Sequence, residues 1–186
     1  MIVIAILVVA VSMFSQIVTS TAQMRSVSRE RSLAAEAARN VLERMRNEPL
    51  SDVFDLFNAS PEDDPDGLGT APGHRFPVRG LRPLESVDDG SVGEIVMPAL
   101  WVALERKTKS SAGTADGLWT LREDSLDESL DMPRDLNGDN MIDALDHRYD
   151  ALSIPVLVRI AWQGRYGARS LEMRTVLTDF DLGDTR

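Results

Sequence analysis

Acidic and amide side chains are crowded into one short segment of the chain, "DLNGDNMIDALD", residues 135 to 146. Counted from Asp135 as position 1, oxygen-bearing side chains recur at positions 3, 5, 9 and 12, and a methionine stands at position 7. A hard cation such as Ca²⁺ takes six to eight oxygen ligands, and carboxylates this close together repel one another unless a cation neutralises them. The spacing therefore predicts a structural calcium site whose ligands are the side chains of Asp135, Asn137, Asp139, Asp143 and Asp146 and the backbone carbonyl of Met141.

This spacing is that of an EF-hand-type loop, with two departures. Asn140 stands at position 6, where Gly is usual, and it is the next best residue for a left-handed backbone. Asp146 replaces Glu at position 12, which resembles the loops of dockerin modules. Only one such loop exists, which argues against a paired calcium sensor. The alternatives are a surface turn without metal, or magnesium, which prefers fewer protein ligands. We expect the filled loop to order the strands that follow it.

The chain offers little for catalysis. It has no Cys, so it has no thiol nucleophile and no disulfide, and it has only two histidines, His74 and His147. A zinc site would need more His or any Cys. Asp146, His147 and Ser153 can be drawn as a triad, but proximity in sequence is not geometry, and Asp146 is better placed as a metal ligand. We therefore expect a protein that is not an enzyme and has no catalytic residues.

The charge balance bears on the kind of partner. The 30 Asp and Glu residues outnumber the 20 Lys and Arg residues, for a net charge of −10, and the acidic excess lies in residues 51 to 150. Because nucleic acid is itself a dense array of negative charge, this excess argues against nucleic acid as a partner.

The chain opens with an apolar run, "MIVIAILVVAVSMFSQIV", residues 1 to 18. A membrane-spanning helix needs about 20 such residues, so the run is at the short limit. No basic residue precedes it, and the first is Arg25, which weighs against a cleaved secretory signal. A buried core helix would be unusual at a bare terminus. We expect a membrane anchor.

An amphipathic pattern follows the apolar run. Apolar residues lie four apart at Leu33, Ala37, Val41 and Met45, with a second row beside them at Ala34, Ala38 and Leu42, which is one stripe of a helix. No Gly or Pro intervenes before Pro49, which favours one continuous helix over residues 2 to 48 rather than a tether followed by a separate helix. We therefore divide the chain into a hydrophobic helix (1–23), its amphipathic continuation (24–48) and a globular head (49–186).

Strand-like segments fill much of the head. The clearest are residues 155–163 and 169–180, which flank the short connection "GRYG" in the pattern of a β-hairpin. Further candidates are residues 75–81, 93–106 (interrupted at Pro98) and 118–123. The predicted fold class is α+β, in which a long N-terminal helix, membrane-embedded in its first half, packs against a small antiparallel sheet.

The order of these elements resembles that of type IV pilin-like proteins, especially minor pilins and the minor pseudopilins of type II secretion. The resemblance rests on the apolar start, the helix "SLAAEAARNVLERMR" and the terminal hairpin "VRIAW…RSLEMRTVLT". It implies a structural subunit of a pilus or pseudopilus, anchored by a single pass in the inner membrane, with the head outside the cytoplasm. The implied partners are the lipid bilayer and other pilin-like subunits, which pack through the N-terminal helix, where Ala5, Ala10 and Ser12 are the small residues available.

The start of the chain departs from the family pattern. The family begins with a basic leader, a cleavage point, Phe-Thr-Leu and a Glu five residues into the mature chain, and none of these is present here. The sequence given is either truncated or begins at a start codon placed too far downstream, or the protein has lost processing. The rival interpretation is a membrane-tethered, calcium-dependent binding or adhesion module that does not polymerise.

Overall fold

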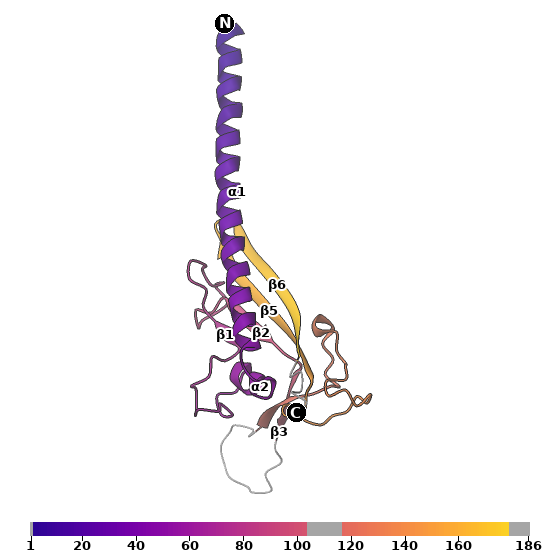
Figure 1. Cartoon of the computed structure of the whole chain (residues 1–186). Coiled ribbons are helices and arrows are strands. Elements are labelled where there is room, and N and C mark those ends of the chain that lie inside the picture. Colours follow the sequence, from indigo (N-terminus) through magenta and orange to yellow (C-terminus); the bar gives the residue numbers. More distant parts are fainter. Residues whose placement is uncertain (1, 104–116, 179–186) are drawn as a thin grey trace, which may run out of the picture.

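The computed structural model describes residues 2–103 and 117–178. Six strands form two antiparallel sheets, a four-stranded sheet in the order β1-β2-β5-β6 and a separate pair, β3-β4 (Figure 1). The elements in chain order are helices α1 (Ile2–Arg46) and α2 (Leu50–Phe57), strands β1 (Arg75–Phe76), β2 (Gly93–Val96), β3 (Ala99–Ala103) and β4 (Gly117–Leu121), the 3₁₀ helix η1 (Glu128–Leu130), and strands β5 (Ser153–Gly164) and β6 (Gly167–Thr178).

Helix α1 is a single rod of 45 residues, about 68 Å long at 1.5 Å per residue. It runs past residue 20 without a break, as the absence of Gly and Pro before Pro49 favours. Its C-terminal half lies along β5 and β6, while its N-terminal half projects beyond the head (Figure 1).

The prediction that the first half of this helix is embedded in a membrane is wrong. A span needs about 20 predominantly apolar residues, whereas the uninterrupted apolar run ends before Ser12, and Ser15 and Gln16 follow closely. Among the described residues, no helix is both long enough and apolar enough to cross a membrane. The predicted fold class is corrected to a helix packed on antiparallel strands, with no such span in the described part of the chain. The predicted single-pass location in the inner membrane is corrected with it.

The hairpin predicted near the C-terminus is confirmed. Strands β5 and β6 pair along their whole length, from Ser153 opposite Thr178 to Gly164 opposite Gly167. Only Arg165 and Tyr166 connect them, and Gly167 supplies a positive φ of 117° where the chain reverses. Strand β2 pairs with the other edge of β5, so β5 lies in the interior of its sheet.

The core lies between α1 and one face of the large sheet. The helix contributes Ala34, Ala38, Leu42 and Met45, all buried. Trp162 donates a hydrogen bond from its Nε1 to Glu30 of α1, which places the even-numbered positions of β5 on the face toward the helix. These positions are apolar and buried: Ile154, Val156, Val158, Ile160 and Trp162. The stripe predicted from the spacing of apolar residues is therefore the packed face of α1, centred on the row that begins at Ala34.

The other predictions of secondary structure hold in part. Residues 75–81 give only the two-residue strand β1, and residues 93–106 divide at Pro98 into β2 and β3, because proline cannot donate to a strand ladder. Residues 104–106 and 179–180 of the predicted strands lie outside the described residues. Helix α2 was not predicted, although it buries Leu50, Val53, Phe54 and Phe57, which have helical spacing.

Candidate metal centre

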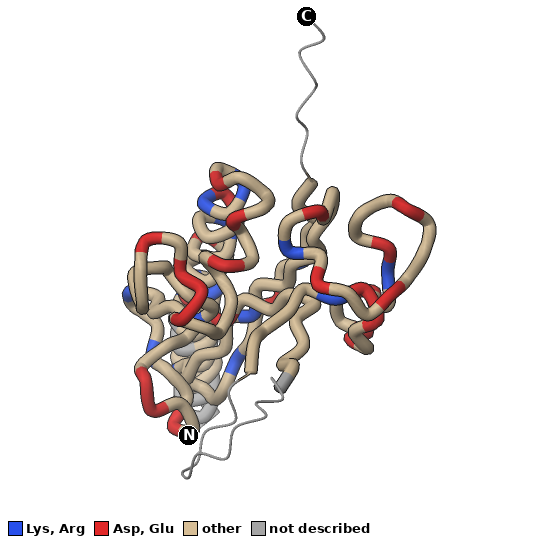
Figure 2. The backbone as a smooth tube through the Cα atoms, turned by 90° about the horizontal axis from the view of Figure 1, so that it is seen from below, with Lys and Arg blue, Asp and Glu red and all other residues tan. Residues whose placement is uncertain are grey.

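The acidic segment lies in the long connection from β4 to β5, at the end of the head away from the N-terminus of α1. Acidic residues gather on the loops of the head (Figure 2). The connection is fixed by its backbone. His147 donates from its backbone N–H to the carbonyl of Leu121 at 2.8 Å, and Leu152 donates to the carbonyl of Leu136 at 2.8 Å. The side chain of Leu136 is buried, so this loop contributes an apolar residue to the core.

Side-chain to backbone hydrogen bonds order the first half of the predicted calcium loop. The Asp135 carboxylate accepts hydrogen bonds from the backbone N–H groups of Gly138 at 2.6 Å and Asn140 at 2.8 Å. The Asn137 side chain accepts from Asp139, and the Asp139 side chain accepts from Met141. Asn140 has a φ of 64°, so the predicted left-handed backbone at position 6 is present. These bonds wrap the backbone around the side chains at positions 1, 3 and 5.

Asp146, the predicted ligand at position 12, is engaged elsewhere. Its Oδ1 accepts hydrogen bonds from the backbone N–H groups of Leu121 at 3.0 Å and Arg148 at 3.3 Å, and its Oδ2 lies 2.9 Å from Nε of Arg148. These contacts tie Asp146 to β4 and to a buried arginine. The predicted carboxylates Asp135, Asp139 and Asp146 therefore do not form one close group with Asp143.

Within the described residues, a different group brings its ligand atoms together. One atom each of Glu123, Asp143 and His147 lie within 4.8 Å of one another, and the group could hold a metal ion. Nε2 of His147 lies 3.0 Å from Oδ1 of Asp143 and 3.8 Å from Oε2 of Glu123. Glu123 is 1% exposed and His147 2% exposed, whereas the side chain of Asp143 is 32% exposed.

Backbone donors hold the buried carboxylate of Glu123 in place. Its Oε1 accepts hydrogen bonds from the N–H of Leu136 at 2.7 Å and from that of Asn137 at 3.3 Å, and its Oε2 accepts from that of Asp143 at 3.3 Å. Glu123 thus links the end of β4 to both halves of the acidic loop. On the far side of the imidazole, Nδ1 of His147 lies 3.1 Å from Oδ1 of Asp150.

The charges around the imidazole change its protonation. Burial lowers the pKa of His147. The hydrogen bonds with Asp143 and Asp150 and the charge of Glu123 raise it by a larger amount, so the pKa lies above its ordinary value. The pKa of Asp143 is lowered, first by the backbone N–H of Leu145 and then by His147. Both shifts favour an ion pair between the imidazolium group of His147 and the carboxylate of Asp143.

Glu123 and His147 were not predicted as ligands from the sequence. The spacing of Asp143 and His147, four residues apart, is a signal that could have paired them. No comparable signal marks Glu123, which is distant in sequence from the acidic segment and joins it only because β4 ends beside it.

The chain was compared with models of known protein families, with curated proteins and with solved structures, and none of them matches it.

Proposed function

We propose that this protein is a pilin-like structural subunit that assembles with other subunits of its kind through the N-terminal half of α1. The observation that carries the proposal is the exposed apolar surface of this half of the helix, on which Ile4, Leu7, Val11 and Phe14 form one stripe and on which Val3 and Met13 are exposed as well. Ile4, Leu7, Val11 and Phe14 are between 60% and 69% exposed. Their spacing of three, four and three residues is that of the seam between two packed helices.

The surroundings of the stripe support the same function. No Asp, Glu, Lys or Arg occurs before Arg25, so no charge opposes close helix packing there. An exposed apolar surface of this extent on a helix is typical of an interaction site. The other half of α1 is held by the core of the head, which leaves the projecting half free to pack against a second helix.

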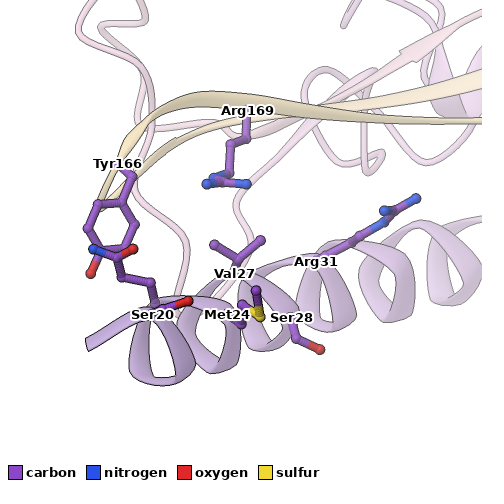
Figure 3. Close-up of a pocket in the computed structure, with 8 residues that line it drawn as sticks. Ser20, Met24, Val27, Ser28, Arg31, Tyr166 and Arg169 are labelled. Carbon is purple, nitrogen blue, oxygen red and sulfur yellow. The ribbon is translucent and has the colours of Figure 1, made fainter. Parts of the chain in front are cut away.

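A groove lies at the point where α1 meets the head (Figure 3). The groove has a volume of about 580 Å³. Met24 and Val27 line it from the helix, and Tyr166 and Arg169 line it from the β5–β6 hairpin. The groove lies on the side of α1 that faces the hairpin, and the proposed assembly does not depend on it.

Disulfide cross-linking tests the assembly. The chain has no cysteine, so a single introduced one gives no background. We expect Leu7→Cys to form disulfide-linked dimers under mild oxidation, while Ser51→Cys, on the exposed surface of the head, remains monomeric. The double variant Leu7→Glu, Phe14→Glu should shift the protein toward monomer in sedimentation velocity, whereas Met13→Glu, at an exposed position off the stripe, should do so less.

The opposite result would favour the rival function. If the unmodified protein sediments as a monomer at all concentrations and Leu7→Cys cross-links no faster than Ser51→Cys, the assembly proposal fails. A calcium-dependent binding or adhesion module that does not polymerise would then be the better description.

We propose, further, that calcium is the ion bound by the loop of residues 135–146. The support is the arrangement of Asp135, Asn137 and Asp139 around a turn closed by the positive φ of Asn140. Asp143 and the carbonyl of Met141 would complete the oxygen ligands, and the proposal does not depend on Asp146.

We expect added Ca²⁺ to raise the melting temperature, since an ion that binds only the folded state stabilises it. The increment should vanish in Asp135→Ala and persist in Asp88→Ala; a melting curve unchanged by calcium in the unmodified protein would refute it.

A further inference from the structure

We propose that Glu123, Asp143 and His147 form a second metal site, which takes an imidazole-binding divalent ion of the zinc type rather than calcium. Two of its three ligands, Glu123 and His147, are buried side chains outside residues 135–146, whereas Asp143 is common to this site and to the calcium loop, so an ion in one site competes with an ion in the other for that carboxylate. The second site stands independently of any assembly through α1.

The separations of the ligand atoms suit a small ion. In tetrahedral coordination with bonds of about 2.0–2.1 Å, neighbouring ligand atoms are about 3.3 Å apart. Nε2 of His147 lies 3.0 Å from Oδ1 of Asp143 and 3.8 Å from Oε2 of Glu123, on either side of that value. Small side-chain adjustments would bring all three atoms into the first coordination shell, with water as a fourth ligand.

The imidazole is already oriented for coordination. Asp150 holds Nδ1 at 3.1 Å, which leaves Nε2 as the nitrogen that faces Glu123 and Asp143. A carboxylate behind a histidine fixes the ring and increases the basicity of the ligating nitrogen, as in many zinc sites. Asp150 is not one of the three ligands, so it orients the imidazole independently of Glu123 and Asp143.

Burial and access are also those of a metal site. Glu123 is 1% exposed and His147 2% exposed, and a buried carboxylate is costly unless a positive charge or hydrogen bonds compensate it. The side chain of Asp143 is 32% exposed, so an ion from solvent can reach the site at this carboxylate.

The nitrogen ligand selects the class of ion. Calcium and magnesium prefer ligand sets made of oxygen, whereas imidazole is a common ligand of zinc and of other divalent ions of the first transition series. The low number of protein ligands agrees with this choice, because zinc is held by three or four ligands and calcium by six to eight. The expectation that a zinc site needs more His or any Cys left out the carboxylates, which also bind zinc and supply two of the three ligands here.

Cobalt absorption spectroscopy on the full-length, tag-free protein tests the site. Co²⁺ takes the place of Zn²⁺, and the position and intensity of its visible bands report the coordination number and geometry of the bound ion. We expect one Co²⁺ per chain, displaced by an equivalent of Zn²⁺ but not by Ca²⁺ at the same concentration. His147→Asn should weaken Co²⁺ binding about 100-fold, while the matched variant His74→Asn, which removes the other histidine, and Asp135→Ala, in the calcium loop, should bind as the unmodified protein does.

A second variant keeps the test decisive if His147→Asn does not fold. Asp143→Ser removes a partly exposed ligand and its contact with Nε2, while Asp150 still holds Nδ1 of the imidazole, and it should weaken Co²⁺ binding at least about tenfold. Absence of visible bands in the unmodified protein, bands that survive both variants, or bands lost in His74→Asn would each overturn the proposal. Displacement of Co²⁺ by equimolar Ca²⁺ would overturn the choice of ion class.

Discussion

Arg148 connects the acidic segment around residues 135–146 to the rest of the head. Its guanidinium group is buried and lies 3.0 Å from a carboxylate oxygen of Asp55, 3.4 Å from one of Asp63 and 2.9 Å from one of Asp146. It also donates a hydrogen bond to the backbone carbonyl of Trp119 and stacks 5.3 Å from the centre of the Phe54 ring. One cation thus serves three carboxylates from three segments, which explains why Asp146 is drawn away from the calcium loop.

Asp55 gives this cluster a pH dependence. Burial raises the pKa of Asp55 to about 6, an effect that outweighs the opposing charge of Arg148 and is reinforced by Asp63 and Asp146. Because the pKa is higher in the folded state than in the unfolded state, the folded protein binds a proton between pH 6 and pH 4 that the unfolded chain does not. The stabilisation is therefore complete in acid and is lost as the pH rises through about 6.

We predict that lowering the pH from 7 to 5 stabilises the unmodified protein relative to Asp55→Asn by on the order of 1 kcal/mol. The asparagine has no proton to gain, and the contributions of the two histidines cancel in the comparison because both proteins contain them. Urea denaturation of the two proteins at pH 5, 6 and 7 measures the difference. Parallel pH profiles would show that Asp55 does not titrate in this range.

At the scale of elements, the contact between α1 and the sheet depends on two alanines. Ala34 and Ala38 are completely buried against the sheet, and their small side chains let the helix axis approach closely. Larger apolar residues lie farther along the same buried face of α1, at Leu42 and Met45, and the apolar residues of α2 belong to the same core. The taper of side-chain size along α1 therefore sets how the helix lies on β5 and β6.

We predict that Ala38→Leu destabilises the head by about 1–3 kcal/mol, because inserting methylene groups into a packed core forces the neighbouring side chains or backbone to shift. Asn40→Leu, two residues away at an exposed position, is the matched control and should change the free energy of unfolding by no more than about 0.5 kcal/mol. Equal effects of the two substitutions in urea denaturation would mean that this face of α1 does not pack against the sheet.

Periodicity decides which of these elements could be predicted from the sequence. The alternation in β5 and the rows of α1 are long enough to show which side chains are buried. Helix α2 is only 8 residues long and follows Pro49, so its apolar residues were not distinguished from a loop. The membrane-embedded segment was inferred from a count of apolar residues, and the polar residues from Ser12 onward were given too little weight.

The metal centre was predictable only where its residues are close in sequence. The left-handed Asn140 and the turn around Asp135 follow from local spacing, and the structure shows both. The position of Asp146 depends on Arg148 and β4, and that of Glu123 depends on where β4 ends, so both are tertiary effects that spacing does not contain.

At the scale of the whole molecule, an uncharged apolar rod is joined to an acidic head. The net charge of the chain is −10, and the acidic residues gather on the loops of the head (Figure 2). In the proposed assembly, the stripe that begins at Ile4 brings the rods together, and the same packing brings the negative heads close to one another. Apolar packing is insensitive to moderate salt, whereas repulsion between exposed charges is screened by it.

We therefore predict that association strengthens as salt is added. Raising the ionic strength from about 0.01 M to about 0.15 M shortens the screening length from about 30 Å to about 8 Å, so that repulsion between heads weakens while the helix contact is unchanged. Sedimentation velocity at the two salt concentrations should show a larger oligomer fraction at the higher one. The control is the variant Leu7→Glu, Phe14→Glu, whose small oligomer fraction should respond much less. If association instead weakens with salt, ion pairs rather than the apolar stripe hold the copies together, and the contact must lie on the charged head.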